Sequence, residues 1–441
     1  MILLFFFVSF SSSTLFRAYF SSTSMLFGIT HFFVSFFVFS FSKIYIESKY
    51  TYFMKKSIST FLKHTAQDKV NRSANPAVVR ASTIFFKSMQ ELLKHKDPSK
   101  NNRVDYYDYG RAGTQTTTQL QNIIVELEKA HHVFLTPSGF ASVALSIMSI
   151  CRPGDEIIVT DSVYFPTRMI TSKLLKEFGV KAQFYNPDNF QDLKNKVTKK
   201  TKMIFVENPG SNTFEFQDLS AIAKLAKKNN IITALDNTWG TPLYLRPLEI
   251  GFDMSISSAT KYFSGHSDVM VGTLAVNKKV FQKVNFYNRV SGYRASPDDA
   301  YLVIRGLRTL DVRLERHEKN TKEVIKFLSK QKKIVEILYP YKKSSKDYKN
   351  WKKYYSGATG LLSLVIKSKS KNSVFKFINS LELFGIGYSW GGFESLAVYQ
   401  DIQREFKKYD NKDLHIVRLH IGLEDPKDLI LDIKNSLKYI K

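Results

Sequence analysis

The sequence predicts an α/β fold: a mostly parallel, seven-stranded sheet with helices on both faces, followed by a smaller C-terminal α+β domain. Three observations support this prediction. Short apolar runs alternate with segments of helical periodicity from about residue 120 onward, these segments carry helix-capping residues, and the alternation changes after residue 310. The length of 441 residues and the hydrophobic fraction of 44% are sufficient for two or three domains with buried cores.

The strand candidates are short enough to be buried strands of a parallel sheet. They comprise residues 133–135, 156–160, 181–185, 202–207, 231–236, 254–259 and 271–276. Two of the segments between them are typical of the predicted helices. Residues 167–179 place apolar side chains at helical spacing and end at Gly179, a common C-cap residue. Residues 218–230 begin at Asp218, a common N-cap residue.

The chain is predicted to divide into four parts. These are an aromatic-rich extension (1–53), an N-terminal arm (54–113), a large domain (114–310) and a small C-terminal domain (311–441). Residues 306–328 are expected to form a long amphipathic helix between the two domains. Residues 360–366 and 415–422 are strand-like segments of the small domain.

The first 53 residues differ in composition from the rest of the chain. They contain 14 of the 36 phenylalanines and a single acid, Glu47, and residues 25–42 contain no Lys, Arg, Asp or Glu. This run is long enough for a marginal membrane span or an uncleaved signal sequence. We favour a third interpretation, in which the start is mis-assigned and translation begins at Met54, because the sequence from there on is that of an ordinary soluble N-terminus.

The net charge of +26 does not indicate a nucleic-acid-binding protein. The 65 Lys and Arg residues are scattered, without the interleaved aromatic residues or the zinc-ligand spacing of known nucleic-acid modules. The single cysteine, Cys151, excludes an internal disulfide framework, fits a reducing, cytoplasmic location and is predicted to be buried. There is no GxGxxG or Walker loop. The histidines lack zinc-ligand spacing, so no metal is expected.

Asp236 and Lys261 stand at the ends of two strand candidates that neighbour each other along the chain. In an open parallel sheet, ligands bind where strands end and helices begin. A lysine and an aspartate in these places can hold pyridoxal phosphate (PLP), the lysine as a Schiff base and the aspartate against the protonated pyridine nitrogen. Ser258, Thr260 and the backbone N–H groups of residues 138–142 are suited to bind the phosphate.

Eight ordered motifs resemble the Cys/Met-metabolism family of PLP-dependent enzymes, and within it the bacterial cystathionine β-lyases. They are YGRAGTQTT (109–117), FLTPSGFASV (134–143), ENPGS (207–211), LDNTWG (235–240), SSATKYFSGHSDVMVGT (257–273), RGLRTLDVRL (305–314), YSWGGFESL (388–396) and RLHIGLED (418–425). The resemblance runs from about Met54 to the C-terminus and implies the fold-type I architecture of PLP-dependent transferases. Two positions depart from the β-lyase pattern: Asn208 replaces a small hydroxyl residue, and the bulky Phe140 stands where a small residue is common.

The resemblance implies how the cofactor would be held. Lys261 would form the Schiff base and act as catalytic acid and base, Tyr164 would stack on the cofactor ring, and Asp236 would pair with the ring nitrogen. The other implied cofactor ligands are Gly139, Phe140, Ser258 and Thr260, together with Tyr109 and Arg111 of a neighbouring subunit.

The resemblance also implies a substrate and an assembly. Arg418 would bind the α-carboxylate of an amino acid, with Ser389 and Trp390 beside it. The implied reaction is β-elimination of L-cystathionine to homocysteine, pyruvate and ammonia in methionine biosynthesis. Because Tyr109 and Arg111 would reach a neighbour's phosphate, we expect a homotetramer built from dimers with shared active sites.

Three alternatives remain open. A cystathionine γ-lyase or γ-synthase is disfavoured by residues 109–117, which replace a segment common in those relatives, and by Trp390, where they usually have a non-aromatic residue. A general cysteine-S-conjugate β-lyase would use the same chemistry. A non-catalytic, membrane-tethered binding protein would account for the aromatic N-terminus, but Lys261, Asp236 and Arg418 are all present and argue against it.

Overall fold

The computed structural model describes residues 57–68, 70, 72–95, 108–340, 343 and 347–441, and residues Ile58–Lys441 form one compact unit. The extension 1–53, with its three interpretations, lies outside the described residues. Among the described residues, no helix is long and apolar enough to cross a membrane.

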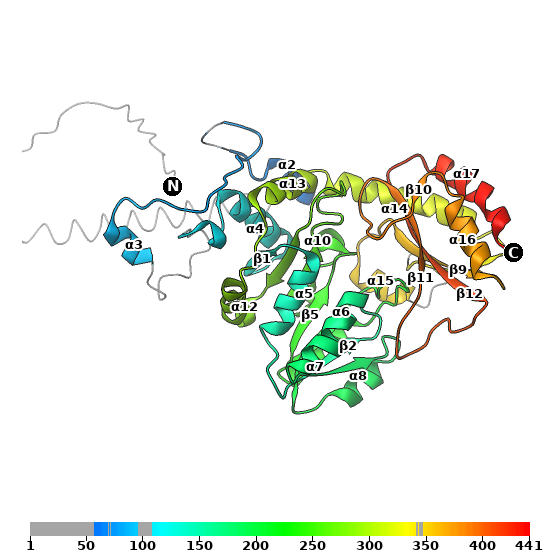
Figure 1. The fold of residues 1–441 in the computed structure, drawn as a ribbon, viewed down its shortest axis with the longest axis horizontal. Coiled ribbons are helices and arrows are strands. Elements are labelled where there is room, and N and C mark those ends of the chain that lie inside the picture. The colour runs from blue at the N-terminus through cyan, green and yellow to red at the C-terminus, as the bar shows by residue number, and fades with distance from the viewer. Residues whose placement is uncertain (1–56, 69, 71, 96–107, 341–342, 344–346) are drawn as a thin grey trace, which may run out of the picture. The chain divides into compact units, whose positions relative to one another are not determined.

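The central sheet has seven strands in the order β1-β7-β6-β5-β4-β2-β3 (Figure 1). Their bounds are β1 His132–Thr136, β2 Glu156–Thr160, β3 Lys181–Tyr185, β4 Thr201–Glu207, β5 Ile232–Asp236, β6 Met254–Ser258 and β7 Gly272–Val276. Only β7 runs antiparallel to its neighbours, β1 and β6. The predicted mostly parallel, seven-stranded sheet is therefore confirmed, with strand bounds within two residues of the predicted ones.

Helices cover both faces of this sheet, as predicted. Alternate strand residues point to opposite faces, so that Ala234 packs into one apolar cluster and Leu235 into another. Helices α5 (Gly139–Met148) and α12 (Lys278–Ser291) contribute to the first cluster. The helices on the opposite face are α4 (Gln115–Glu128), α9 (Leu219–Lys228) and α13 (Pro297–Leu307). The short helices are α2 (Ile58–His64), α3 (Met89–His95), η1 (Gly110–Ala112), α8 (Phe190–Lys196), α10 (Thr241–Tyr244) and α11 (Pro247–Ile250).

The two helix predictions between strands had different outcomes. Asp218 is the N-cap of α9, as predicted, and its side chain accepts a hydrogen bond from the backbone N–H of Ala221. The helix expected over 167–179 is present without a gap as α6 (Phe165–Met169), η2 (Ile170–Leu174) and α7 (Leu175–Glu177), but η2, in its middle, is a π-helical turn. The Thr171 hydroxyl donates to the carbonyl of Thr167 (2.8 Å), and such side-chain bonds compete with the helical pattern.

The second sheet has five strands in the order β10-β11-β12-β9-β8. Their bounds are β8 Ile334–Leu338, β9 Leu361–Lys367, β10 Phe384–Gly385, β11 Ser395–Gln400 and β12 Leu414–His420. The helices of this part are α14 (Leu310–Leu328), α15 (Tyr348–Tyr354), α16 (Lys371–Asn379) and α17 (Pro426–Ser436), followed by η3 (Leu437–Tyr439). The smaller C-terminal α+β part is therefore confirmed.

The single long helix expected over 306–328 is wrong, because α13 ends at Leu307 and α14 begins at Leu310. Arg313 Nη2 donates to the carbonyl of Gly306 at 2.8 Å. This carbonyl would accept from residue 310 in an unbroken helix, and here it accepts instead from the guanidinium and from the backbone N–H of Thr309 (3.1 Å). The arginine itself is drawn inward by the carbonyl of Tyr262, at 2.7 Å from Nη1.

One apolar cluster spans both sheets. It contains Ile204 and Leu235 of the central sheet and Leu364 and Val417 of the C-terminal sheet. Because this core is continuous, the domain boundaries at 113/114 and 310/311 stay predictions. Cys151 is buried, as predicted, and burial raises the pKa of its thiol to about 12.

A buried carboxyl gives a test of this packing. Glu128, the last residue of α4, is buried and accepts a hydrogen bond from Ser255 Oγ (3.1 Å). Burial raises the pKa of this carboxyl from 4.5 to about 8. A group with a raised folded-state pKa loses its contribution to the free energy of unfolding as pH rises through that range. We therefore expect Glu128→Gln to become progressively more stable than the wild-type chain between about pH 5 and pH 8.

Urea unfolding of both proteins at the two pH values measures this difference. A stability difference that does not change with pH would show that Glu128 ionises in the folded chain as it does in water.

Candidate active site

Strands β2, β4, β5 and β6 are hydrogen-bonded neighbours that end at one edge of the central sheet. Glu207 and Asp236 are the last residues of β4 and β5, and Tyr164 and Lys261 lie in the segments that follow β2 and β6. Parallel strands bring their carboxyl ends together, which explains why these residues meet although they are distant in sequence. The edge therefore collects one amine, two carboxylates and one phenol.

Lys261 lies in the turn after β6 and is partly buried. Its Nζ donates to Ser389 Oγ at 2.6 Å and lies 5.6 Å from the centre of the Trp390 ring. Burial, and secondly the positive charge of Arg418, lower the pKa of the amine to about 8, although Asp236 acts in the opposite direction. A lysine in this state is uncharged far more often than a surface lysine, and so is a better nucleophile.

Asp236 is the last residue of β5. Its Oδ1 accepts hydrogen bonds from the backbone N–H (3.0 Å) and the hydroxyl (2.6 Å) of Thr238. Burial raises the pKa of this carboxyl, while the Thr238 bonds and the charge of Lys261 act against the rise. Thr238 Oγ1 also accepts from the backbone N–H of Ser258 (2.9 Å), and so joins the ends of β5 and β6.

Glu207 ends β4 and is the register partner of Asp236 across the two strands. Its Oε2 accepts a hydrogen bond from the backbone N–H of Tyr164 at 2.6 Å. Burial, and secondly the nearby charge of Asp236, hold the pKa of Glu207 well above its usual value. Each of these neighbouring carboxyl groups therefore disfavours the ionised form of the other, and the upward shift in pKa is the stronger one at Glu207.

Tyr164 precedes α6 and is 47% exposed. Partial burial raises the pKa of its phenol, as do the negative charges of Glu207 and Asp236, while Arg418 acts in the opposite direction. The ring is therefore un-ionised at neutral pH and is open to a ligand that lies over this edge of the sheet.

The residues expected to hold a phosphate surround the start of α5. The helix begins at Gly139, after Ser138, whose side chain caps the N–H of Ala141. A Cβ on Gly139 would lie only 2.6 Å from the Cβ and Oγ of Ser258, so only glycine fits between this helix and β6. Phe140 is 39% exposed.

Thr260 was expected to donate its hydroxyl to the phosphate. Instead, the hydroxyl accepts from the backbone N–H of Val271 (3.0 Å) and donates to its carbonyl (3.3 Å). A phosphate contact from Thr260 would therefore have to replace the bond to this carbonyl.

Arg418 projects from β12 toward the same region. Its Nη2 donates to the carbonyl of Ser389 (3.1 Å), a bond that fixes the loop between β10 and β11. Burial lowers the pKa of the guanidinium to about 10, so it stays cationic at neutral pH. Within the part of the chain that the structure describes, its side chain has no ion-pair partner, which leaves it able to bind an anion.

Tyr109 and Arg111 do not join this group within one chain. Arg111 Nη1 donates to the carbonyl of Arg289 on α12 (3.1 Å), and Tyr109 is 49% exposed and forms a bridge with Thr83. Their expected role in a neighbouring subunit stays a prediction.

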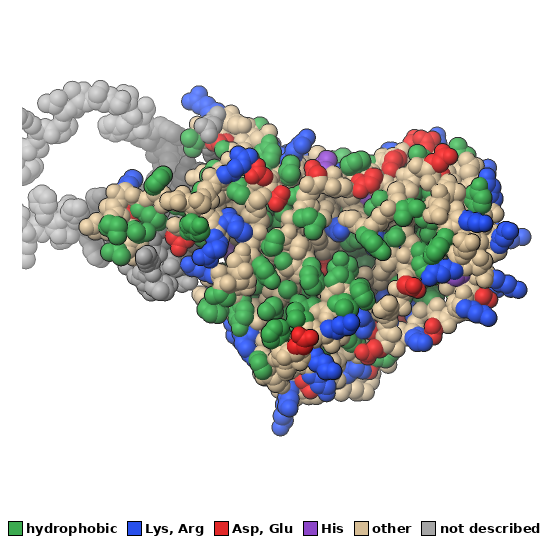
Figure 2. Space-filling view, in the orientation of Figure 1, with side chains coloured by type: hydrophobic (Ala, Val, Ile, Leu, Met, Phe, Trp, Pro, Cys, Tyr) green, Lys and Arg blue, Asp and Glu red, His purple; other side chains and the backbone are tan. Residues whose placement is uncertain are grey.

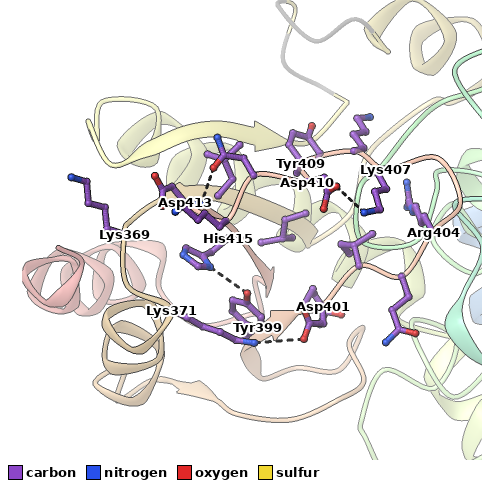
Figure 3. A pocket seen from close by; sticks show the side chains of 18 residues that line it. Lys369, Lys371, Tyr399, Asp401, Arg404, Lys407, Tyr409, Asp410, Asp413 and His415 are labelled. Carbon is purple, nitrogen blue, oxygen red and sulfur yellow. Dashed lines mark hydrogen bonds and ion pairs between the residues drawn. The ribbon is translucent and has the colours of Figure 1, made fainter.

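One sizeable cavity does not include Lys261. A cavity of about 1060 Å³ lies between β11, β12 and the loop that joins them (Figure 3). Four of the cations that line it are in ion pairs: Lys371 with Asp401 (3.5 Å), Lys407 with Asp410 (3.0 Å), and Arg404 and Lys408 with Glu215 (2.9 Å each). No group of three or more His, Cys, Asp or Glu among the described residues could hold a metal ion.

Sequence reasoning missed two residues that shape the site, Glu207 and Thr238. Both lie inside motifs that the sequence pointed to, ENPGS and LDNTWG, but their roles depend on contacts across strands. The residues present fit PLP, because Asp236 is a desolvated carboxylate that needs a cation beside it, and Gly139 makes the close approach that a phosphate cradle requires.

Comparison with known proteins supports the same conclusion. A cystathionine beta-lyase of Bordetella avium is 35% identical over 391 residues, covering 87% of this chain and 98% of the relative. An L-alanine/L-glutamate racemase of Wolbachia pipientis wMel is 33% identical over 374 residues, covering 83% and 92%. The crystal structure of metB from Corynebacterium glutamicum has a TM-score of 0.79 at 27% identity, covering 88% of this chain and 99% of that chain.

These findings confirm the predicted cofactor and fold class, and they support the predicted class of enzyme, a PLP-dependent carbon–sulfur lyase. The sequence profile described as "Cys/Met metabolism PLP-dependent enzyme" matches residues 59–438. The chain therefore belongs to the Cys/Met metabolism family of PLP-dependent enzymes.

Proposed function

We propose that this protein is a cystathionine β-lyase, which cleaves L-cystathionine to homocysteine, pyruvate and ammonia. The proposal rests on one observation: an arginine able to bind a carboxylate, Arg418, lies next to an amine of lowered pKa, Lys261, with Ser389 bonded to both. This arrangement suits an α-amino acid whose α-proton is removed. The relatives named as β-lyases and the Trp390 motif favour β-cleavage over γ-cleavage.

The cofactor would be held by residues from four strand ends. Asp236, kept in place by Thr238, would face the pyridine nitrogen, and Tyr164 would flank the ring. The phosphate would lie at the N-terminus of α5 beside Ser258. When bound, PLP supplies an electron sink for the carbanion at the substrate Cα.

Lys261 would do the proton transfers. Its amine takes the proton from Cα and delivers it to the sulfur as the Cβ–S bond breaks, so that homocysteine leaves as a thiol. The remaining three-carbon fragment reacts with water to give pyruvate and ammonia. A pKa of about 8 is close to physiological pH, which lets one group act both as base and as acid.

A second candidate reaction is amino-acid racemisation, favoured by the similarity to the Wolbachia racemase. Racemisation begins with the same removal of the α-proton, so Lys261 and Arg418 would serve it unchanged. Chiral chromatography after incubation with L-alanine or L-glutamate tests this candidate reaction. The D-isomer forms only if Cα is protonated again on the face opposite to the one that lost its proton.

We also propose that the active sites are shared within a homotetramer in the cytoplasm. Tyr109 and Arg111 lie on the arm rather than at the strand ends of their own chain, which suits a role in a second copy. Exposed apolar side chains gather over α5 and over the helical segment from α6 through η2 to the end of α7 (Figure 2), at Met148, Phe165, Leu174 and Phe178. An apolar surface of this kind is typical of subunit association.

The product of cleavage tests the proposed reaction. Purified protein loaded with PLP and supplied with L-cystathionine is expected to release pyruvate, and Lys261→Ala is expected to lose activity by about 10²–10⁴-fold because it removes the acid and base. Lys283→Ala, which changes an exposed lysine of α12, serves as the control. Release of 2-oxobutyrate in place of pyruvate would mean γ-cleavage.

The pKa of Lys261 predicts how the cofactor loads. The neutral amine is the reactive form, so the rate at which the apoprotein becomes yellow with added PLP should rise with pH up to about 8 and then level off. Arg418 lowers this pKa, so Arg418→Gln should move the midpoint to higher pH. Stopped-flow absorbance measures both profiles, and an unmoved midpoint in Arg418→Gln would show that the two cations do not interact.

A further inference from the structure

A pair of buried histidines lies directly behind the loop that carries Ser389 and Trp390. His420 is on β12, two residues after Arg418, so both side chains point to the same face of the sheet. His317 is on α14, and the centres of the two rings are 5.1 Å apart. Both side chains are almost fully buried, with relative exposures of 0% and 1%.

The loop is pressed against the backbone of Lys261. A Cβ on Gly391 would lie 2.9 Å from the backbone N of Tyr262 and 3.1 Å from the Cβ of Lys261, and the φ of Gly391 is +86°. Ser389 also has a left-handed φ, of +80°, which is costly for a residue with a side chain. Contacts from elsewhere must therefore hold this loop in shape.

His420 provides such a contact. Its Nε2 accepts a hydrogen bond from the backbone N–H of Gly391 at 3.1 Å, so the ring hydrogen is on Nδ1. The same Nε2 lies 3.2 Å from the carbonyl of Gly392, which would become its partner only if this nitrogen carried a hydrogen. Burial, His317, Arg418 and Lys261 all lower the pKa of His420 well below its usual value, which keeps the ring neutral and able to accept.

His317 complements this ring. Its Nδ1 lies 2.8 Å from the carbonyl of Ile421, which can only accept, so Nδ1 carries the hydrogen and Nε2 has the lone pair. Nδ1 of His420 and Nε2 of His317 are buried and have no hydrogen-bond partner among the described residues. The two rings therefore support each other by packing, at 5.1 Å between their centres, and not by a direct hydrogen bond.

Helix α14 thereby supports both sides of the site. Arg313, one turn before His317 on the same face, holds the carbonyl of Tyr262, next to Lys261. His317 faces His420, which holds the loop. We propose that His420, backed by His317, is a positioning residue that holds the loop of Ser389 and Trp390 against Lys261 and so sets the affinity for the substrate carboxylate. This inference rests on the proposed function of Ser389 and Arg418.

Two substitutions at His420 and one matched control test the inference. His420→Gln can place an amide oxygen near the position of Nε2 and keep the acceptor, whereas His420→Leu removes it. His415→Leu is the control, because His415 is a buried histidine of the same strand that bonds instead to the carbonyl of Ser368 (3.0 Å) and to Tyr399 (3.2 Å).

Two measurements are made on the PLP-loaded proteins: hydrogen exchange of the peptide covering residues 388–395, by mass spectrometry, and KM and kcat for L-cystathionine. We expect His420→Leu to exchange faster in this peptide and to raise KM by about tenfold, the loss of roughly one hydrogen bond, with a smaller change in kcat. His420→Gln should stay within about threefold of wild type in KM. His415→Leu should lower thermal stability without changing the exchange rate of this peptide or the KM for L-cystathionine.

The inference is overturned if the loop peptide of His420→Leu exchanges hydrogen at the wild-type rate. It is also overturned if His415→Leu speeds exchange of this peptide as much as His420→Leu does, because the effect would then come from a general loss of packing. If the wild-type enzyme does not cleave cystathionine, the proposed function fails, but the exchange measurement still decides the role of His420.

Discussion

Removing charged groups from water is the constraint on which this structure depends. At one edge of the central sheet, the chain holds an amine, a guanidinium and two carboxyl groups in partly or fully buried positions. Burial disfavours the charged form of each group. The free-energy cost of this desolvation is reduced only where a hydrogen-bond donor or an opposite charge lies beside the group. Thr238 donates to Asp236, the backbone of Tyr164 donates to Glu207, and the opposite charges of Lys261 and Asp236 partly offset each other.

The same constraint explains why polar residues concentrate at the strand ends while the strands themselves are apolar. The carboxyl ends of neighbouring parallel strands lie at the same edge of the sheet, so the side chains at these ends lie close together. Rigid placement follows from the core beneath, in which residues of both sheets pack into one cluster. Arg418, supplied by the second sheet, is held relative to Lys261 by this shared packing as well as by the hydrogen bond to Ser389.

The strands and the Lys261–Asp236 pair were predictable from the sequence, because both depend on local patterns. The bounds of β2 and β3 agree with the prediction to the residue, since these short apolar runs are bounded by polar residues. The break between α13 and α14 was not predictable, because it depends on Arg313 reaching a carbonyl seven residues away in sequence and the Tyr262 carbonyl in another segment. Glu207 was missed for the same reason, as its partners Tyr164 and Asp236 lie on different strand ends.

The buried position of Cys151 has a consequence for an enzyme that would release homocysteine. A thiol whose pKa is about 12 is hardly ever a thiolate at neutral pH, and thiolate is the form that exchanges with disulfides. Because Cys151 is also the only cysteine of the chain, formation of a mixed disulfide between the protein and its own product is disfavoured. The only thiol of the chain is thereby protected from exchange with disulfides of the compound that the enzyme would release.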